Sequence, residues 1–410
     1  MEISAKSSSQ SQIEWLRRLC EIQPVAARLL VKNEEEQCRL GYFHTFREIC
    51  QQPETWLHTS ELMQEYSAEL SSVINGLSSL TLSGSGSSEY AGGCVCTQLR
   101  RNLGINVQAV GAGAVLTHGI HALPVGTPSL MVSLARSGDS PESVGALVLL
   151  RRLEPEMRHL VLTCNREGRL ANTFRTDPKV TVITLDDCTN DRSLVMTSSF
   201  TNMVLGAQFL GLLSDPARYK AIASALAVAG SALLQDQMSA FEQVARKPFR
   251  RTLFLGSGAR FAAAKEASLK MVEMTAGRVT TTCETFLGLR HGPMSGIDDQ
   301  TLIVCFLSTD PMVRAYETDV VRELAQKELG LVRILAGQNV PDDLPAPGDT
   351  VVRYRSTNLA DEDLPILDVV VGQLLAFFRC LGEGLRPDSP SGNGIIRRVV
   401  PAFTLHLPKG

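Results

Sequence analysis

Apolar and polar positions follow two different periodicities along the chain. Up to about residue 80, apolar side chains recur every three or four residues, as at Ile13, Leu16 and Leu19, which predicts helices. Pro53 interrupts this pattern, so one helix should end before it and another should start there. The first 80 residues are therefore expected to be helical.

From residue 80 onward, short apolar runs alternate with longer stretches of helical spacing. The first series predicts strands at 79–83, 105–109, 129–134, 159–164 and 180–185, and helices at 89–103, 140–153 and 197–213. After a helix at about 216–246, a second series predicts strands at 252–256, 279–283, 301–307, 332–336 and 350–354, and helices at 259–276, 312–329 and 364–381. Such alternation is typical of doubly wound α/β domains with a mainly parallel sheet.

The two series repeat one pattern at an offset of 172 residues. Gly84-Ser85-Gly86 returns as Gly256-Ser257-Gly258, each after an apolar run. A constant offset would also align the later strands without gaps, for example Leu160 with Val332. The halves differ after the strand at 129–134, where the polar segment 136–140 has Leu307-Ser308-Thr309-Asp310-Pro311 as its counterpart. The difference predicts one composite site formed by two unequal halves.

The fold class follows as α/β, with two tandem doubly wound parallel-sheet domains after an N-terminal helical segment. We expect a helical extension at 1–60, a first domain at 61–220 that binds the ligand, a second domain at 221–385 that carries the catalytic groups, and a tail at 386–410. The tail begins with a stretch rich in Pro, Ser and Gly, which favours irregular structure.

Composition and charge do not point to a nucleic-acid or membrane partner. The chain has 410 residues, of which 44% are hydrophobic and 20% charged, with a net charge of −3. These values are ordinary for a globular protein and give no reason to expect nucleic acid or a membrane as partner. The N-terminal stretch lacks the pattern of a signal peptide, so a cytoplasmic location is expected. The ten cysteines show no zinc spacing, so Cys94-Val95-Cys96 is interpreted as core packing and no metal is predicted.

The segment Ser83 to Ser88 joins a predicted strand to a predicted helix. Its glycines would let the backbone approach a ligand, and the start of a helix offers unpaired N–H groups to an anion. The alternative is a flexible Gly/Ser linker, which the strand–turn–helix context disfavours. Glu89 stands where a dinucleotide fingerprint needs its third glycine, and no Gly-Lys-Ser/Thr follows. NAD and nucleotide binding are therefore disfavoured, and no cofactor is predicted.

The segment Arg136 to Glu142 follows another predicted strand. Ser137 and Ser140 offer hydroxyl groups beside Gly138, and a helix starting near Pro141 offers its positive end. This combination suits a phosphate monoester on a small metabolite. The alternative, that Ser140 only caps the helix, is compatible with binding.

The densest group of chemically active residues lies between Lys265 and Pro293. Glu266, Lys270 and Glu273 share one helix face; for Glu266 and Lys270 an ordinary solvated ion pair remains an open alternative. Glu273 lies between apolar residues and is the candidate general base. His291 lies in a Gly-Pro loop after Arg290, where a histidine that transfers protons is expected.

Together these segments resemble the sugar isomerase (SIS) family, and within it the AgaS type. The matching segments are Ser-Gly-Ser-Gly-Ser-Ser-Glu-Tyr-Ala-Gly (83–92), Arg-Ser-Gly-Asp-Ser-Pro-Glu-Ser (136–143), Met-Thr-Ser-Ser-Phe-Thr (196–201), Glu-Ala-Ser-Leu-Lys-Met-Val-Glu-Met-Thr-Ala-Gly (266–277), Leu-Gly-Leu-Arg-His-Gly-Pro (287–293) and Arg-Arg-Val-Val (397–400). The resemblance extends from about His44 to the C-terminus and implies flavodoxin-like SIS domains. AgaS-type proteins are described as D-galactosamine-6-phosphate deaminase/isomerases or as tagatose-6-phosphate ketose/aldose isomerases.

The resemblance also implies a role for individual residues. It implies a phosphate anchor, Arg136, Ser137, Gly138 and Ser140; contacts to the sugar hydroxyls, Ser87, Ser88, Thr197 and Ser198; a general base acting between C1 and C2, Glu273; and a histidine that assists ring opening, His291. In related enzymes this histidine comes from a neighbouring subunit, which implies a homodimer or a higher homo-oligomer. In the tail, Arg398 is expected to bind substrate. The related glucosamine-6-phosphate synthase has a lysine in its tail, whereas an arginine stays protonated and does not form a Schiff base.

The implied activity is conversion of D-galactosamine 6-phosphate to D-tagatose 6-phosphate and ammonia. The alternatives are a ketose/aldose isomerase without deamination, a glucosamine-6-phosphate deaminase, and, less favoured, a non-catalytic sugar-phosphate sensor. A sensor needs neither Glu273 nor His291, and this chain has both.

Overall fold

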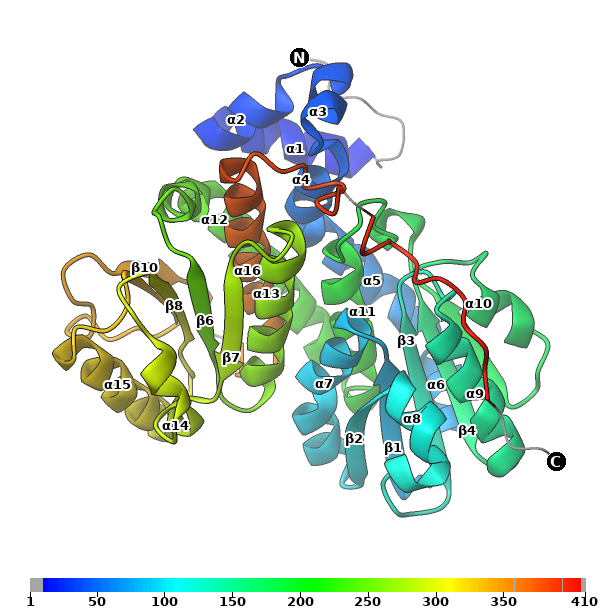
Figure 1. Ribbon diagram of the computed structural model, residues 1–410. Helices are drawn as coiled ribbons and strands as arrows, with labels where there is room; N and C mark the ends of the chain where they lie inside the picture. The colour runs from blue at the N-terminus through cyan, green and yellow to red at the C-terminus, as the bar shows by residue number, and fades with distance from the viewer. Residues whose placement is uncertain (1–9, 357–358, 393, 407–410) are drawn as a thin grey trace. The chain divides into compact units, whose positions relative to one another are not determined.

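Two five-stranded parallel sheets form the framework of the protein, and their strand order is the same. The computed structural model describes residues 10–356, 359–392 and 394–406. The first sheet has the order β2-β1-β3-β4-β5, and the second, read from the equivalent edge, has the order β7-β6-β8-β9-β10. All paired strands are parallel. The predicted fold class, with helices at the N-terminus, is confirmed (Figure 1).

The elements have the following bounds. The strands are β1 (Ser79–Gly84), β2 (Asn106–Gly111), β3 (Ser129–Ala135), β4 (Arg158–Thr163), β5 (Val180–Thr184), β6 (Arg251–Leu255), β7 (Thr280–Glu284), β8 (Thr301–Phe306), β9 (Val332–Gly337) and β10 (Thr350–Arg353). The α-helices are α1 (Gln10–Ile22), α2 (Pro24–Leu30), α3 (Glu34–Leu40), α4 (Phe43–Cys50), α5 (Gln52–Glu65), α6 (Ser67–Ile74), α7 (Ser87–Leu103), α8 (Ala112–His118), α9 (Pro141–Leu153), α10 (Arg169–Phe174), α11 (Ser198–Gln208), α12 (Pro216–Ala245), α13 (Ala259–Met274), α14 (Phe286–Leu289), α15 (Pro311–Gln326) and α16 (Pro365–Gly382). Short 3-10 helices are η1 (Gly119–Ala122), η2 (Asp187–Thr189), η3 (Phe209–Gly211) and η4 (Pro293–Gly296).

The chain forms two compact units, each assembled from separate stretches of sequence. The first-sheet unit contains residues 55–191 and 198–223 and the tail from Gly394. The second-sheet unit contains the residues up to Glu54 together with 192–197 and 224–393. Helix α12 starts in the first of these units and continues in the second. The domain boundaries expected from the sequence remain a prediction.

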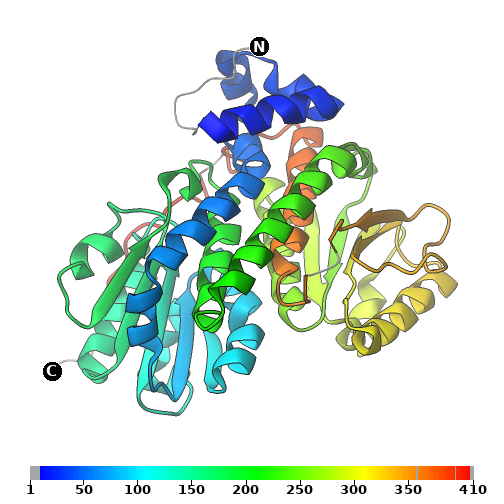
Figure 2. The same cartoon turned by 180° about the vertical axis from the view of Figure 1, so that it is seen from behind.

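The first-sheet unit is doubly wound, with helix pairs packed against its sheet (Figures 1 and 2). Helices α7 and α11 pack against each other, and so do α8 and α9. Apolar side chains of β2, β3, α8 and α9 share one cluster that includes Val110, Met131 and Leu150. The unit thereby places the carboxyl ends of β1 and β3, two neighbouring strands, at one edge of the sheet.

The second-sheet unit repeats this plan. Helices α14 and α15 pack on the sheet through a cluster that includes Leu255, Phe286 and Val321, while α13 packs closely against α16. The close approach needs a glycine, because a Cβ at Gly372 on α16 would collide with Ala267 on α13. Helix α16 also contacts the N-terminal helix α4, which joins the helical segment to this unit.

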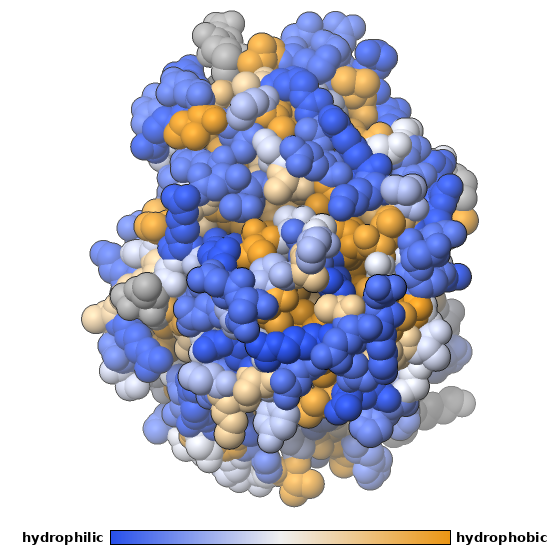
Figure 3. Space-filling model, turned by 90° about the vertical axis from the view of Figure 1, so that its left-hand side faces the viewer, coloured by the Kyte–Doolittle hydropathy of each residue, from blue (hydrophilic) through white to orange (hydrophobic). Residues whose placement is uncertain are grey.

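Helix α16 is apolar for most of its length. Among the described residues it alone is long and apolar enough to cross a membrane by length and composition, but 89% of it is buried inside the protein. Burial on this scale is what a central core helix requires. Large exposed apolar side chains include Met312 and Tyr316, one turn apart on α15, and hydrophilic residues predominate on the face seen in Figure 3.

The predicted strands are found to within two residues, but the constant offset of 172 between the halves holds only for the first and third strands of each. In the second strands Asn106 pairs with Ser79 and Thr280 pairs with Arg251, so the offset there is 174. Ser129 and Thr301 pair with Ser79 and Arg251, which preserves the offset of 172. In the next strand Arg158 pairs with Leu130 and Val332 pairs with Leu302, so the offset there is 174. The cause is the unequal length of the connections between strands. The short helices α8, α10 and α14 were not predicted.

Candidate functional site

The turn after β1 brings a helix start to the edge of the first sheet. Gly86 has φ of 58° and precedes α7, whose first residues Ser87 and Ser88 are each 5% exposed. A Cβ at Gly84 would lie 2.7 Å from the backbone carbon of Ser88. Only glycine at this position allows the helix to start so close to the strand, and the first N–H groups of α7 are thereby presented at the sheet edge.

Neighbouring hydroxyl groups at this edge were not predicted. Within the described part of the chain, the buried hydroxyls of Ser83, Ser85 and Ser133 have no hydrogen-bond partner. Ser83 on β1 lies directly beside Ser133 on β3. Buried hydroxyls without partners are uncommon in proteins and favour contact with a ligand or water. The sequence gives a weak signal for them, because a serine inside an apolar strand is easily interpreted as packing.

The loop after β3 is held by hydrogen bonds of its serine hydroxyls. Arg136 and Ser137 are 7% and 9% exposed, and Gly138 has φ of 69°. The Ser137 hydroxyl accepts the N–H of Asp139 at 3.2 Å. The Ser140 hydroxyl donates to Glu142 at 2.6 Å and makes no capping bond to α9. Ser140 precedes the helix as expected, but its side chain is not the helix cap, so that alternative is wrong.

Arg398 of the tail connects two of the predicted binding segments. Its carbonyl accepts a hydrogen bond of 2.6 Å from the guanidinium of Arg136. Its own guanidinium donates to the carbonyl of Asp191 at 2.8 Å and to Oδ1 of Asn190 at 2.6 Å. The tail has no helix or strand at residues 394–406, yet these bonds fix Arg398 against the loop after β3.

Asp191 in turn holds the start of α11. Its carboxylate accepts the backbone N–H groups of Ser198 at 3.0 Å and Ser199 at 2.9 Å. Ser198 and the preceding Thr197 are fully buried, and the carbonyl of Thr197 accepts a hydrogen bond from Gln373. The first-sheet unit therefore brings Arg136, Arg398 and Ser198 together, whereas Thr197 belongs to the second-sheet unit.

The second-sheet unit contains a buried row of alternating charges on α13. The Nζ of Lys270 lies 3.3 Å from Oε1 of Glu266 and also pairs with Oε2 of Glu273. Glu266 and Lys270 have no exposed side-chain surface, whereas 22% of Glu273 is exposed. The solvated ion pair considered for Glu266 and Lys270 is therefore wrong, and Glu273 is the member of the row that reaches solvent.

The charges in this row depend on one another. Burial lowers the pKa of Lys270, but the carboxylates of Glu266 and Glu273 outweigh burial, so that the pKa is raised overall. Lys270 therefore stays a cation beside Glu273. The expected apolar surroundings of Glu273 are not found, since the carboxylate is paired with an ammonium group instead. Lys270 and Glu266 were not assigned a role from the sequence.

His291 lies in the same unit, in the loop between α14 and η4. Its backbone N–H donates to the carbonyl of Gly288 at 3.0 Å, and the residue is exposed. Within the described ranges its ring forms no hydrogen bond or ion pair with the chain. Gly292, with φ of 127°, permits the sharp turn that follows. The ring is thus available to a ligand.

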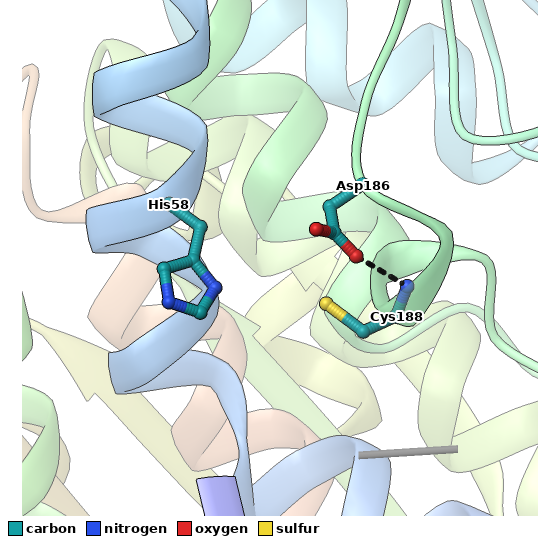
Figure 4. Close-up of side chains that lie close together, drawn as sticks. All are labelled: His58, Asp186 and Cys188. Atoms are coloured by element: carbon teal, nitrogen blue, oxygen red, sulfur yellow. Dashed lines mark hydrogen bonds between the residues drawn. The ribbon is translucent and has the colours of Figure 1, made fainter. Parts of the chain in front are cut away.

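Three side chains of the first-sheet unit could together hold a metal ion. His58 on α5 faces Asp186 and Cys188 at η2 (Figure 4), with all three ligand atoms within 4.8 Å of one another. Imidazole, carboxylate and thiolate groups are all zinc ligands. Asp186 already accepts the N–H of Cys188 at 2.9 Å and caps η2. None of the three belongs to the predicted site.

The strand order and the loops at the strand ends define a sugar-isomerase fold, and comparison with known proteins identifies the group within it. The chain is 36% identical to an AgaS protein of Streptomyces coelicolor over 88% of its length and 95% of that protein. It is 30% identical to the D-galactosamine-6-phosphate deaminase AgaS of Shewanella sp. ANA-3, over 92% of this chain and 95% of the relative. The chain belongs to the AgaS family.

A solved structure supports the same family assignment. A Clostridium novyi protein assigned to the tagatose-6-phosphate ketose/aldose isomerases superposes with a TM-score of 0.85 at 30% identity, covering 92% of this chain and 98% of that one. No family model matches the chain.

Proposed function

We propose that the protein is a hexosamine-6-phosphate deaminase/isomerase that converts D-galactosamine 6-phosphate and water to D-tagatose 6-phosphate and ammonia. The observation that carries the proposal is membership of the AgaS family over nearly the whole chain, with a relative named for this activity. As part of this proposal, the domain at 61–220 binds the substrate and the domain at 221–385 carries the catalytic groups.

In this proposal, the first half holds the substrate. The loop Arg136 to Ser140 anchors the phosphate through the hydroxyls of Ser137 and Ser140 and the helix end behind them. Ser87 and Ser88, with Thr197 and Ser198, contact the sugar hydroxyls. The partnerless hydroxyls of Ser83, Ser85 and Ser133 support a polar ligand at this edge. Arg398 contributes by holding the guanidinium of Arg136 through its carbonyl. It has no covalent role, because an arginine stays protonated and does not form a Schiff base as a lysine can.

Glu273 is the proposed general base. It removes the proton from C2 of the open-chain amino sugar and returns a proton to C1. The amine at C2 thereby becomes an imine, to which water adds, and ammonia leaves. The exposure of Glu273 supports this role, because it is the one carboxylate of the row with solvent-accessible side-chain surface, at 22%, whereas Glu266 has none. With a hydroxyl at C2, the same proton transfer interconverts aldose and ketose.

His291 is proposed to assist ring opening. Its exposed ring supports action on a ligand, and we propose that it serves the site of a neighbouring subunit in a homodimer or higher homo-oligomer. We also propose a cytoplasmic enzyme without nucleic-acid or membrane partners, a view supported by the finding that none of the ten cysteines forms a disulfide.

A plain ketose/aldose isomerase is the second candidate, because the similar Clostridium novyi structure is assigned to that activity. One experiment separates the two. Ammonia release is measured with galactosamine 6-phosphate and glucosamine 6-phosphate side by side, while tagatose 6-phosphate is incubated alone and its aldose is assayed. Ammonia from galactosamine 6-phosphate supports deamination. Aldose formation from tagatose 6-phosphate with no ammonia from either amino sugar would favour the isomerase. Binding without any turnover would favour a sensor.

A further inference from the structure

The loop after β8 holds a carboxylate that comes from another part of the chain. Thr309 donates its backbone N–H to Oδ1 of Asp361 at 2.6 Å and its hydroxyl to the same oxygen at 2.9 Å. The hydroxyl of Ser308 donates to the other oxygen, Oδ2. Both oxygens of one carboxylate are therefore bound by a backbone amide and two hydroxyl groups, which are donors that also suit a phosphate.

This loop is the counterpart of the Arg136–Ser140 loop in the first half. Strands β3 and β8 each occupy the middle of their sheet, and each loop leads into a helix with proline in its first turn. Thr309 stands 172 residues after Ser137, at the offset that the preceding strands obey. The second half has thus kept the hydroxyl and the helix, although its loop sequence looks unrelated.

Charges of both signs lie beside the loop, and the first N–H groups of α15, from Met312 and Val313, are already bound by the carboxylate of Asp310. Nη1 of Arg314 donates to the carbonyls of Ser308 at 3.0 Å and Thr309 at 2.9 Å, which holds a guanidinium against the loop. Glu317, buried on α15, accepts the N–H of Ser308 at 2.6 Å. Burial raises the pKa of Glu317 to about 7, so this second carboxyl group loses most of its charge in mildly acidic solution.

We infer that Ser308 and Thr309 form a phosphate-binding cradle in the second half, and that Asp361 occupies it as a built-in substitute for a phosphate monoester. Asp361 thereby limits the chain to one sugar phosphate, in the first half. The inference rests on the proposed function only where it takes the loop of the first half as a phosphate anchor.

Titration with inorganic phosphate tests the inference. Binding to the wild-type protein and to Asp361→Ala is measured by calorimetry at pH 6, where Glu317 is mostly protonated. Asp361→Ala is expected to bind one more phosphate per chain than the wild type. Adding Thr309→Val should remove the extra site. The control is Asp342→Ala, which deletes an equal charge from a side chain that is 98% exposed in the same unit; it should leave the number of sites unchanged.

The outcomes separate this inference from the proposed function. If wild type binds no phosphate and Asp361→Ala binds one, the anchor in the first half fails and the cradle stands. If both bind one, the cradle is refuted and the anchor stands. Should Asp361→Ala not fold, Asp361→Asn replaces it, and phosphate must raise its unfolding temperature more than that of the wild type. An equal rise, or none, overturns the inference.

Discussion

Removing the ammonium group of Lys270 tests the description of the charged row on α13. The substitution Lys270→Met keeps a side chain of similar length and leaves Glu266, which has no exposed surface, without the cation 3.3 Å away. Removing one partner of a buried ion pair typically costs about 3–5 kcal/mol. We expect a loss of that size in the free energy of unfolding, measured by urea titration at pH 7.5.

Two further variants test whether this loss of stability comes from the buried charge of Glu266. Lys270→Met combined with Glu266→Gln no longer buries an uncompensated charge, so it should recover most of the lost stability. It should not recover turnover, because Glu273 still lacks its cation. The control is Lys265→Met on the same helix, whose ammonium lies 4.7 Å from the ring centre of Phe261 and contributes only about 0.5–1 kcal/mol.

The pH dependence of this stabilisation follows from the sign of the shift. The pKa of Lys270 is raised above 10.5 in the folded protein. Its contribution is therefore fully present below pH 10.5 and is lost only as the pH rises through the folded value. The difference between wild type and Lys270→Met should be largest at pH 9 and should shrink toward pH 6, because the buried Glu266, left without its cation, takes up a proton as the pH falls. A loss under about 1 kcal/mol, or full activity in the double variant, would refute the reasoning.

Three other variants test separate features. Arg398→Ala removes charged hydrogen bonds worth about 1.5–3 kcal/mol each, so kcat/KM should fall by about tenfold or more. The control Arg397→Ala changes an exposed neighbour and should leave kcat/KM within about twofold of the wild type. Equal effects of the two variants would exclude the proposed role of Arg398. Because burial raises the pKa of Glu317 from 4.5 to about 7, the folded state binds an extra proton between these values and loses about 3 kcal/mol of stability as the pH rises through them. Urea titrations at pH 5 and 7.5 should show that Glu317→Gln removes this loss, and an unchanged loss would contradict the assignment. Gly84→Ala should lower the unfolding temperature, since its Cβ would collide with the backbone of Ser88, whereas Gly113→Ala, in open space on α8, should stabilise by about 0.5–1 kcal/mol; equal shifts would contradict the close approach at Gly84.

Most of the fold could be predicted because strands and helices have different apolar periods, and both halves keep them. The short helices α8, α10 and α14 escaped prediction, since four to seven residues are too few to establish a helical period. The registers of β4 and β9 escaped it too, because the preceding connections differ in length. In these registers the step from β8 to β9 is two residues longer than the step from β3 to β4, and the apolar runs alone do not show this difference.

The candidate site was predictable where its residues lie close together in the sequence. The Gly-Ser-Gly turn and the Arg136–Ser140 loop each lie within one connection. The burial of Lys270 was not predictable, because α13 carries small or apolar residues on several sides and its partner α16 comes about 100 residues later. The contact of Asp361 with Thr309 was not predictable for the same reason, because it joins groups that are 52 residues apart in the sequence.

The central claim is tested most directly by ammonia release from galactosamine 6-phosphate, measured with the wild type and with Glu273→Gln under identical conditions. Calorimetry on both proteins confirms that the sugar phosphate is bound. The account predicts equal amounts of ammonia and tagatose 6-phosphate from the wild type, and sugar-phosphate binding without ammonia from Glu273→Gln. A folded wild type that binds the sugar phosphate but releases no ammonia would contradict the account, and comparable ammonia from both proteins would remove Glu273 as the base.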